Sequence, residues 1–299
     1  MIELFDSHAH LQEPEYEDDL DVVVAEARAA GVNEIVLPGE DVTTSQRAAV
    51  VAERFAGVYA AAGFHPHEAA KLTQEGLSRI EALLSQPKVV AVGEIGLDFF
   101  RLHSTQAEQL NAFMVQLDLA QRHTMPVIVH CRDAWEALEE TLAPWAQQAA
   151  PSYRGPHLGV LHYFSSDVAT ARRYFELGFL ISIHTSVTHP KAGQLREVAA
   201  ALPLEALVIE TDSPYGAPQL YRGKRNEPAF VVEAAKKVAE VRSESIDVVA
   251  NATTANARRL FGLDRRKDAA LAPSASAAER HSDGPEGASL RTSGSGAAR

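Results

Sequence analysis

Short β-rich runs alternate with amphipathic helical patterns along most of this chain, and this alternation limits its possible folds more than any other feature. The residues Leu20, Val23, Val24 and Ala27, for example, recur at helical spacing before Gly31, a typical helix stop. The runs predicted as strands cover residues 2–7, 34–39, 58–67 (running into a loop), 89–98, 126–131, 158–164, 179–184 and 206–212. Helices are predicted between them. One contains Leu20 to Ala27, and another begins at a capping box of Thr105 and Glu108 and carries Leu110, Phe113, Met114 and Leu117 on one face. The others cover residues 43–56, roughly 73–85, 133–148, 167–177, about 191–201 and, closing the domain, 228–240 and 244–260.

Eight such strand–helix units predict a single-domain α/β fold, the closed (β/α)8 or TIM barrel. Strict alternation implies parallel strands joined by helical crossovers, and eight units are the number that closes such a barrel. A doubly wound open sheet is the alternative. It has little support as a dinucleotide-binding sheet, because no GxGxxG stretch follows the first strand.

The composition is that of a soluble globular protein with a full core, since 46% of the residues are hydrophobic and 23% are charged. The net charge of −12 disfavours a protein that coats duplex DNA nonspecifically, because such proteins are usually basic. From about Asp264 the chain has no aromatic residue, Val or Ile and is rich in Ala, Ser and Gly. The predicted domains are therefore a barrel over residues 1–263 and a disordered low-complexity tail over 264–299.

A reducing, cytoplasmic location without membrane association is predicted. No apolar run approaches the roughly 18 residues that span a bilayer, and the opening MIELFDSHAH has neither the basic leader nor the apolar stretch of a signal peptide. Cys131 is the only cysteine, so an internal disulfide is impossible. Because it directly follows His130, strand alternation turns it toward the barrel wall, and we interpret it as a small buried hydrophobe rather than a nucleophile.

Conspicuous polar residues fall at or just after the ends of the predicted strands. The carboxyl ends of barrel strands meet at one mouth, where active sites are built, so residues far apart in sequence are expected to meet there. His8 and His10 point the same way because side chains alternate along an extended chain, and by the same parity Asp6 could support them. The residues at this mouth are His8, His10, His65, Glu94, His130, His162 and Asp212.

Histidine and carboxylate side chains together are typical ligands of Zn²⁺ and other divalent transition metals. A single histidine at a strand end is usually a satisfied core or surface residue, and the chain has 12 histidines. The hypothesis of a metal site depends on several of them occupying corresponding strand ends. No role is assigned to His103, His123, His157 and His281, and His184 and His189 could either line the mouth or be solvated.

Six stretches, in this order and with suitable spacing, resemble the TatD family of metal-dependent deoxyribonucleases within the amidohydrolase-like barrels. The resemblance covers about residues 2–262. The first motif alone is common to many amidohydrolases, whereas the third and the last together are specific. The stretches are DSHAHL, GFHPH, VGEIGLDFF, PVIVHCRDA, LHYFSS and IETDSPYGAPQLYRGKRNEP.

The resemblance implies two divalent metal ions (Zn²⁺, Mn²⁺, Mg²⁺ or Co²⁺) and a water that they activate to cleave phosphodiester bonds of DNA, most readily single-stranded. His8, His10 and Asp212 would bind the first ion, His130 and His162 the second, and Glu94 both. The implied catalytic residues are Asp212 as proton acceptor, Glu94, and His65 as phosphate contact or proton donor. Arg222, Lys224 and Arg225 form a basic loop suited to flanking phosphates; a solvated surface turn is the alternative for that loop.

The sequence departs from the family pattern in three places. The usual HCFSG reads HYFSS here, with Tyr163 and Ser166, and alternation suggests that Tyr163 faces away from His162. Gly216 stands where the family usually has a larger aliphatic residue, and this could widen the rim of the substrate site. The loop that contains His184 and His189 is less apolar than is usual in the family. These differences bear on substrate choice more than on chemistry.

Two other functions remain open. The first is a different hydrolase on the same site, such as a D-aminoacyl-tRNA deacylase or another amidohydrolase-like ester hydrolase, because fold does not settle function. The second is a non-catalytic barrel protein, against which the complete ligand set argues. The expected partner is a nucleic acid, and no obligate protein partner is evident.

Overall fold

A computed structural model describes residues 2–153, 155 and 157–264 of the chain. Apart from Asp264, the tail predicted for residues 264–299 lies outside the described residues. In the described part of the chain, no helix combines the length and the hydropathy that crossing a bilayer requires.

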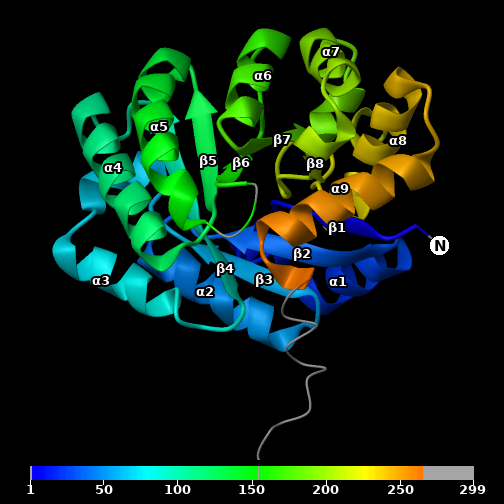
Figure 1. Ribbon diagram of the computed structural model, residues 1–299. Coiled ribbons are helices and arrows are strands. Elements are labelled where there is room, and N and C mark those ends of the chain that lie inside the picture. The colour runs from blue at the N-terminus through cyan, green and yellow to red at the C-terminus, as the bar shows by residue number, and fades with distance from the viewer. Residues whose placement is uncertain (1, 154, 156, 265–299) are drawn as a thin grey trace, which may run out of the picture. The chain divides into compact units, whose positions relative to one another are not determined.

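The eight strands form one parallel sheet in sequential order, β1 to β8, which confirms the predicted barrel (Figure 1). Its two edges meet through backbone hydrogen bonds: the amide of Ser7 donates to the carbonyl of Ile209 at 3.1 Å, and that of Asp212 to His8 at 2.9 Å. The strands are β1 (Leu4–Asp6), β2 (Val32–Pro38), β3 (Val58–Ala62), β4 (Val89–Asp98), β5 (Val127–Arg132), β6 (Gly159–Leu161), β7 (Phe179–His184) and β8 (Leu207–Glu210).

Helices lie between successive strands and surround the sheet (Figure 1). The predicted capping box forms, since Thr105 Oγ1 accepts from the amide of Glu108 and the Glu108 carboxylate accepts from that of Thr105. The helices are α1 (Leu20–Ala29), α2 (Val42–Arg54), α3 (Gln74–Leu83), α4 (Gln106–His123), α5 (Trp135–Ala149), α6 (Val168–Glu176), α7 (Gly193–Ala201), α8 (Val231–Arg242) and α9 (Ile246–Leu260).

Two of the strands that lead to the mouth end earlier than predicted. The strand predicted over 158–164 ends at Leu161, and that predicted over 206–212 ends at Glu210. In both cases a residue with left-handed backbone follows closely, Tyr163 with φ of 45° and Asp212 with φ of 58°. Such a residue ends the extended chain, so His162 and Asp212 stand just beyond their strands.

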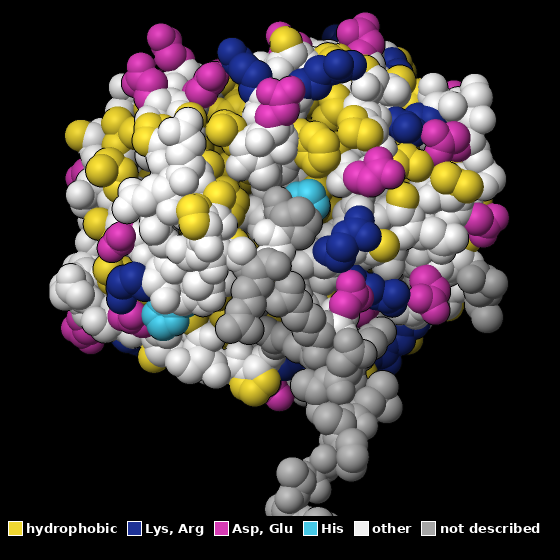
Figure 2. Space-filling view, viewed as in Figure 1, with side chains coloured by type: hydrophobic (Ala, Val, Ile, Leu, Met, Phe, Trp, Pro, Cys, Tyr) yellow, Lys and Arg dark blue, Asp and Glu magenta, His cyan; other side chains and the backbone are white. Residues whose placement is uncertain are grey.

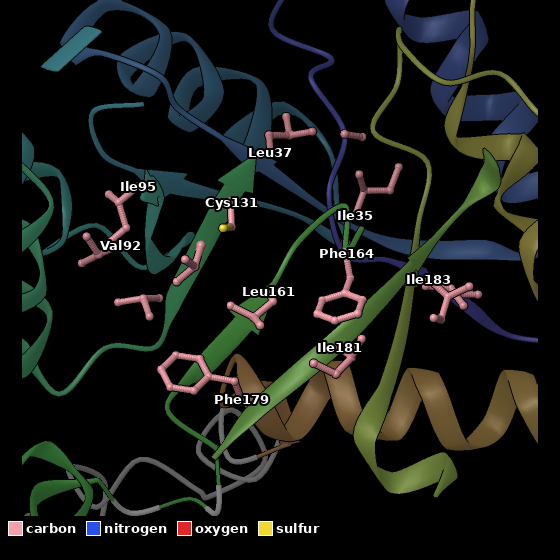
Figure 3. Close-up of a cluster of buried hydrophobic side chains, with 14 of the residues drawn as sticks. Ile35, Leu37, Val92, Ile95, Cys131, Leu161, Phe164, Phe179, Ile181 and Ile183 are labelled. Carbon is pink, nitrogen blue, oxygen red and sulfur yellow. The ribbon is translucent and has the colours of Figure 1, made fainter. Parts of the chain in front are cut away.

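Alternation along the strands divides the core into two parts. Outward-facing side chains pack between sheet and helices, and Figure 3 shows part of this layer, including Leu161, Phe179, Ile181 and Cys131. Inward-facing apolar side chains, among them Phe5, fill the barrel beside residues of α9 and the segment after it; Phe261 stacks on Phe5 with centroids 5.8 Å apart. Helix α9 thus covers one end of the barrel, against β1 and β8, and leaves the other end for a site.

The face of the molecule drawn in Figure 2 carries acidic and basic side chains interspersed with one another. No broad basic area is visible on it, as the net charge of −12 leads one to expect. Contacts with nucleic acid therefore need a local arrangement of residues rather than this whole face.

Candidate metal centre

The centre is built where the inward-facing side chains of the barrel change from apolar to polar. Side chains two residues apart on a strand point to the same face of the sheet. An apolar side chain inside the barrel is therefore followed, two residues later, by another inward-facing side chain that lies closer to the mouth. On four adjacent strands this step is from apolar to polar: Ile128 to His130, Val160 to His162, Leu180 to Ser182 and Val208 to Glu210. The same alternation that directs apolar side chains into the barrel therefore directs these polar side chains into its mouth.

Glu94, the sixth of the ten residues of β4 and 3% exposed, lies at the middle of this polar layer. The expectation that it stands at the end of its strand was wrong. Its Oε2 is 3.2 Å from His8 Nε2, whereas its Oε1 is 2.9 Å from both His130 Nδ1 and His162 Nε2. Burial opposes ionisation, but the neighbouring imidazoles, that of His162 above all, outweigh it and hold the pKa of Glu94 well below its usual range. One ionised carboxylate therefore faces imidazoles with each of its oxygens. The two predicted ligand sets adjoin each other, since the ring centroids of His8 and His162 are 3.8 Å apart.

The first set is formed by His8, His10 and Asp212. The Nε2 atoms of the two histidines are 3.1 Å apart, so both side chains point the same way, as predicted. Asp212 Oδ1 lies 3.7 Å from His8 Nε2 and 3.5 Å from His10 Nε2. Burial lowers the pKa of His10, but the nearby carboxylates of Asp212 and Glu40 raise it to about 9.

The second set is formed by His130 and His162, with His65 beside them. His65 Nε2 is 3.5 Å from Glu94 Oε1, and its Nδ1 accepts the amide of His67 at 3.1 Å. Burial holds the pKa of His65 well below its usual range, so its imidazole is neutral. His65 therefore stands within the group that could hold a metal rather than at its edge.

The donor set fits divalent transition metals. In three groups all ligand atoms lie within 4.8 Å of one another: His8, His10 and Asp212; His8, Glu94 and His162; and His65, Glu94 and His130. Two nitrogens bonded to one ion at about 2.0–2.1 Å are expected roughly 3 Å apart, which is the spacing of His8 and His10. In the described part of the chain no Lys or Arg forms an ion pair with Glu94 or Asp212, whose charges a cation would neutralise.

Two buried carboxylates that sequence reasoning missed hold the imidazoles in place. Asp98 Oδ2 lies 3.3 Å from His130 Nε2 and 2.9 Å from His67 Nε2. Glu210, fully buried, lies 3.3 Å from His162 Nδ1 and accepts the amide of Tyr163 at 2.6 Å. Carboxylates in this position fix the ring orientation of metal-binding histidines. The sequence could have indicated both carboxylates, because Asp98 and Glu210 each lie at the end of a strand and within one of the stretches that carry the family resemblance.

Asp6 ties the two strand ends that present the first set. Its carboxylate accepts the amide of Thr211 at 2.9 Å, the hydroxyl of Thr211 at 2.5 Å and the amide of His8 at 3.3 Å. It thereby joins the end of β1 to the segment after β8. The parity argument for Asp6 as a supporting residue agrees with this geometry.

Glu40, which follows β2, was also missed. Its carboxylate forms a group with His10 and Glu94 whose ligand atoms are within 4.8 Å of one another. Burial raises the pKa of Glu40 to about 7. A third carboxylate thus stands beside the first set of ligands.

The basic loop after β8 is not uniform. Arg222 and Lys224 are exposed, and neither forms an ion pair with another described residue. Arg225 instead pairs with Asp19 at 2.6 Å and Glu227 at 3.0 Å. Arg225 holds the loop against the rest of the barrel, and two cations remain available to a ligand.

Among the described residues, the cysteine and two of the remaining histidines have clear local contacts; His281 lies outside the described residues. Cys131 is 6% exposed and packs in the outer core layer (Figure 3), and burial raises the pKa of its thiol, which confirms a buried hydrophobe. His103 stacks on His67 at 4.6 Å, and His189 Nε2 lies 2.8 Å from the carbonyl of Ala217.

The alternation argument for Tyr163 was wrong in its premise, because Tyr163 lies beyond β6 and has left-handed backbone. Its side chain is placed by loops instead. The ring stacks on His184 with centroids 3.7 Å apart, and its hydroxyl is 3.1 Å from Ser186 Oγ.

Residues 5–262 match the family model described as TatD related DNase. The chain is 37% identical over 261 residues to an uncharacterized metal-dependent hydrolase, YabD, of Bacillus subtilis, covering 87% of this chain and 100% of that protein. It is 38% identical over 266 residues to the 3'-5' ssDNA/RNA exonuclease TatD of Klebsiella pneumoniae, covering 87% and 98%.

Among solved structures, the TatD homolog YJJV from Escherichia coli superposes with a TM-score of 0.80 and 32% identity, covering 87% of this chain and 98% of that one. A TatD family hydrolase from Entamoeba histolytica gives a TM-score of 0.77 at 23% identity, covering 87% and 99%. The second likeness concerns the fold alone.

Proposed function

The chain belongs to the TatD-related DNase family and is a metal-dependent hydrolase of that type, and on this premise we propose that it is a nuclease that hydrolyses single-stranded DNA. A relative 38% identical to it is named as an exonuclease of single-stranded DNA and RNA, which supports a nucleic-acid substrate. Membership in a family of hydrolases argues against the non-catalytic alternative. The match to residues 5–262 also supports a catalytic domain over residues 1–263. A cytoplasmic location stays a prediction.

The observation that carries the proposal is the placement of the two oxygens of Glu94. Oε2 faces His8, while Oε1 faces His130 and His162, so the side chain can bind two ions at once. His8, His10 and Asp212 would complete the first position, and His130 and His162 the second. When bound, two divalent ions supply Lewis acidity toward the phosphate and lower the pKa of water at the site.

The chain's own residues perform the remaining tasks. Asp212 stands just beyond β8 at the first set, where its carboxylate can accept the proton of the attacking water. His65 is positioned to contact the phosphate. Because its imidazole is neutral, it donates a hydrogen bond more readily than it gives up a proton to the leaving group. Arg222 and Lys224 supply positive charge for phosphates on either side.

A substrate panel on metal-reconstituted protein tests the proposal. Single-stranded DNA, duplex DNA, RNA and a D-aminoacyl-tRNA are compared at equal concentration, with Mg²⁺, Mn²⁺, Zn²⁺ or Co²⁺, and the product ends are mapped. The expected result is fastest hydrolysis of single-stranded DNA. Preferred cleavage of the aminoacyl ester would replace the nuclease by a deacylase on the same centre.

Arg222→Ala is expected to raise KM for an oligonucleotide several-fold while changing KM for a small chromogenic phosphodiester little, because only the oligonucleotide has flanking phosphates. Steady-state kinetics on both substrates measures the effect. Arg225→Ala is the matched comparison. Since Arg225 is paired with Asp19 and Glu227, its loss should lower the melting temperature more than Arg222→Ala does. Equal effects of Arg222→Ala on both substrates would argue against a phosphate contact.

Glu210→Ala is expected to weaken binding at the second metal position by about 10- to 100-fold, because His162 loses the carboxylate that orients its ring. Glu210→Gln should recover part of this loss, since its side-chain oxygen can still accept the amide of Tyr163. Calorimetric titration of the metal-free variants with Zn²⁺ or Mn²⁺ measures both. Unchanged affinity in Glu210→Ala would show that His162 is oriented without it.

A further inference from the structure

A cleft lies beside the metal centre, between the segment that follows β6 and the segment that follows β7. It has a volume of about 210 Å³. Its lining combines aromatic, apolar and hydrogen-bonding side chains with one cation: Tyr163, Ser165, Ser166, His184, Lys191 and Gln194, together with Phe164, Ala192 and Leu195. Aromatic and apolar surface combined with groups that can form hydrogen bonds is typical of sites for small ligands.

Tyr163 forms a rigid wall of this cleft. Its ring stacks on His184 with an interplanar angle of 14°, and its hydroxyl is 3.1 Å from Ser186 Oγ. Its backbone amide donates to Glu210 at 2.6 Å. An aromatic surface that is already fixed loses little conformational freedom when a ligand stacks on it.

Gly216 leaves the space that the tyrosine hydroxyl needs. A Cβ at position 216 would lie 3.1 Å from Tyr163 Oη and 3.4 Å from Ser186 Oγ. The backbone there has φ of 63°, and its carbonyl accepts the hydroxyl of Thr185 at 2.6 Å. Tyr163, His184 and Gly216 therefore form one packed unit.

This unit is joined directly to the metal centre. Tyr163 is the next residue after His162, and Glu210 contacts both, through the amide of Tyr163 and through Nδ1 of His162. A group held against Tyr163 would therefore lie next to the residues that form the metal centre. Lys191, exposed at the rim, can contact the next phosphate of a strand.

We propose that this cleft is a nucleobase-binding subsite, in which the base of the nucleotide next to the cleaved phosphodiester stacks on Tyr163. The inference rests on the proposed nuclease function and goes beyond it by assigning a place to one base. A nucleobase fits the lining because it presents a flat π face to Tyr163 and hydrogen-bonding edges to Ser165, Ser166 and Gln194.

The test is an oligonucleotide series in which a single abasic nucleotide is moved along the strand. With the metal-loaded wild-type protein, an abasic nucleotide at one position next to the cut should lower kcat/KM about tenfold, the effect of losing one stacked base. In Tyr163→Ala, kcat/KM for intact DNA should fall by about the same factor. The abasic oligonucleotide should then be cleaved by this variant no more slowly than intact DNA. Tyr163→Phe, which keeps the ring, should retain the dependence on the base.

A second readout needs no turnover. 2-Aminopurine at the same position should be quenched when the oligonucleotide binds metal-free wild-type protein or Tyr163→Phe, and not when it binds Tyr163→Ala. Gly216→Ala should weaken the quenching by displacing the hydroxyl, and adding Tyr163→Phe should restore it, because the clashing oxygen is then absent. Bound metal per chain is measured in each variant to show that the centre is intact.

The outcomes separate the two proposals. If the wild-type protein neither binds nor cleaves oligonucleotides, the proposed function fails. If it cleaves them but no abasic position matters, or the same position matters equally in Tyr163→Ala, the subsite alone is refuted.

Discussion

Glu94→Ala is expected to lower the turnover of single-stranded DNA by roughly 10³-fold or more and to remove bound metal from both positions. The reason is the shared use of one carboxylate. Oε2 lies 3.2 Å from His8, and Oε1 lies 2.9 Å from His162, so a single substitution removes a ligand from each position. Metal content per chain and steady-state turnover, both at defined metal concentration, measure the effect.

Two further variants make this result specific. Glu94→Gln keeps one oxygen, so it should hold less metal than the wild type but more than Glu94→Ala. Glu205→Ala removes an equal charge from an exposed residue before β8, at the opposite end of that strand from the mouth, and should leave metal content and turnover unchanged. Circular dichroism should be native in all three. Two bound ions in Glu94→Ala would refute the shared ligand.

The barrel was predictable because its signals are local. Helical spacing and the capping box of Thr105 and Glu108 depend on residues a few positions apart, and the structure confirms both. Strand parity was equally reliable inside regular strands: it placed His130 toward the mouth and Cys131 toward the outer core layer. It failed at Tyr163, where a left-handed residue interrupts the extended chain.

What the sequence did not reveal depends on contacts between distant segments. Arg225 looks like its neighbours Arg222 and Lys224, yet it is paired with Asp19, which lies 206 residues earlier. Glu40 resembles any other acidic residue until the end of β2 brings it beside His10. Charge type can be read locally, but whether a charge is free, paired or oriented toward a metal is decided by the fold.

Asp212→Asn is expected to lower turnover by about 10²- to 10⁴-fold, the contribution of a positioned proton acceptor. An amide cannot accept the proton of the attacking water, although its oxygen can still face an ion. Asparagine also tolerates the left-handed backbone at this position, where φ is 58°, so the substitution changes the chemistry and not the chain path. Turnover of single-stranded DNA across a range of metal concentrations measures the loss.

The metal dependence distinguishes a proton acceptor from a residue that is only a ligand. His8, His10 and Glu94 remain around the first position in Asp212→Asn, so added metal should refill it. If Asp212 accepts the proton, turnover stays low even at saturating metal. If it serves only as a ligand, saturating metal restores turnover, and the assigned role is wrong. Asp247→Asn, at an exposed residue in the first turn of α9, provides the control and should behave as the wild type.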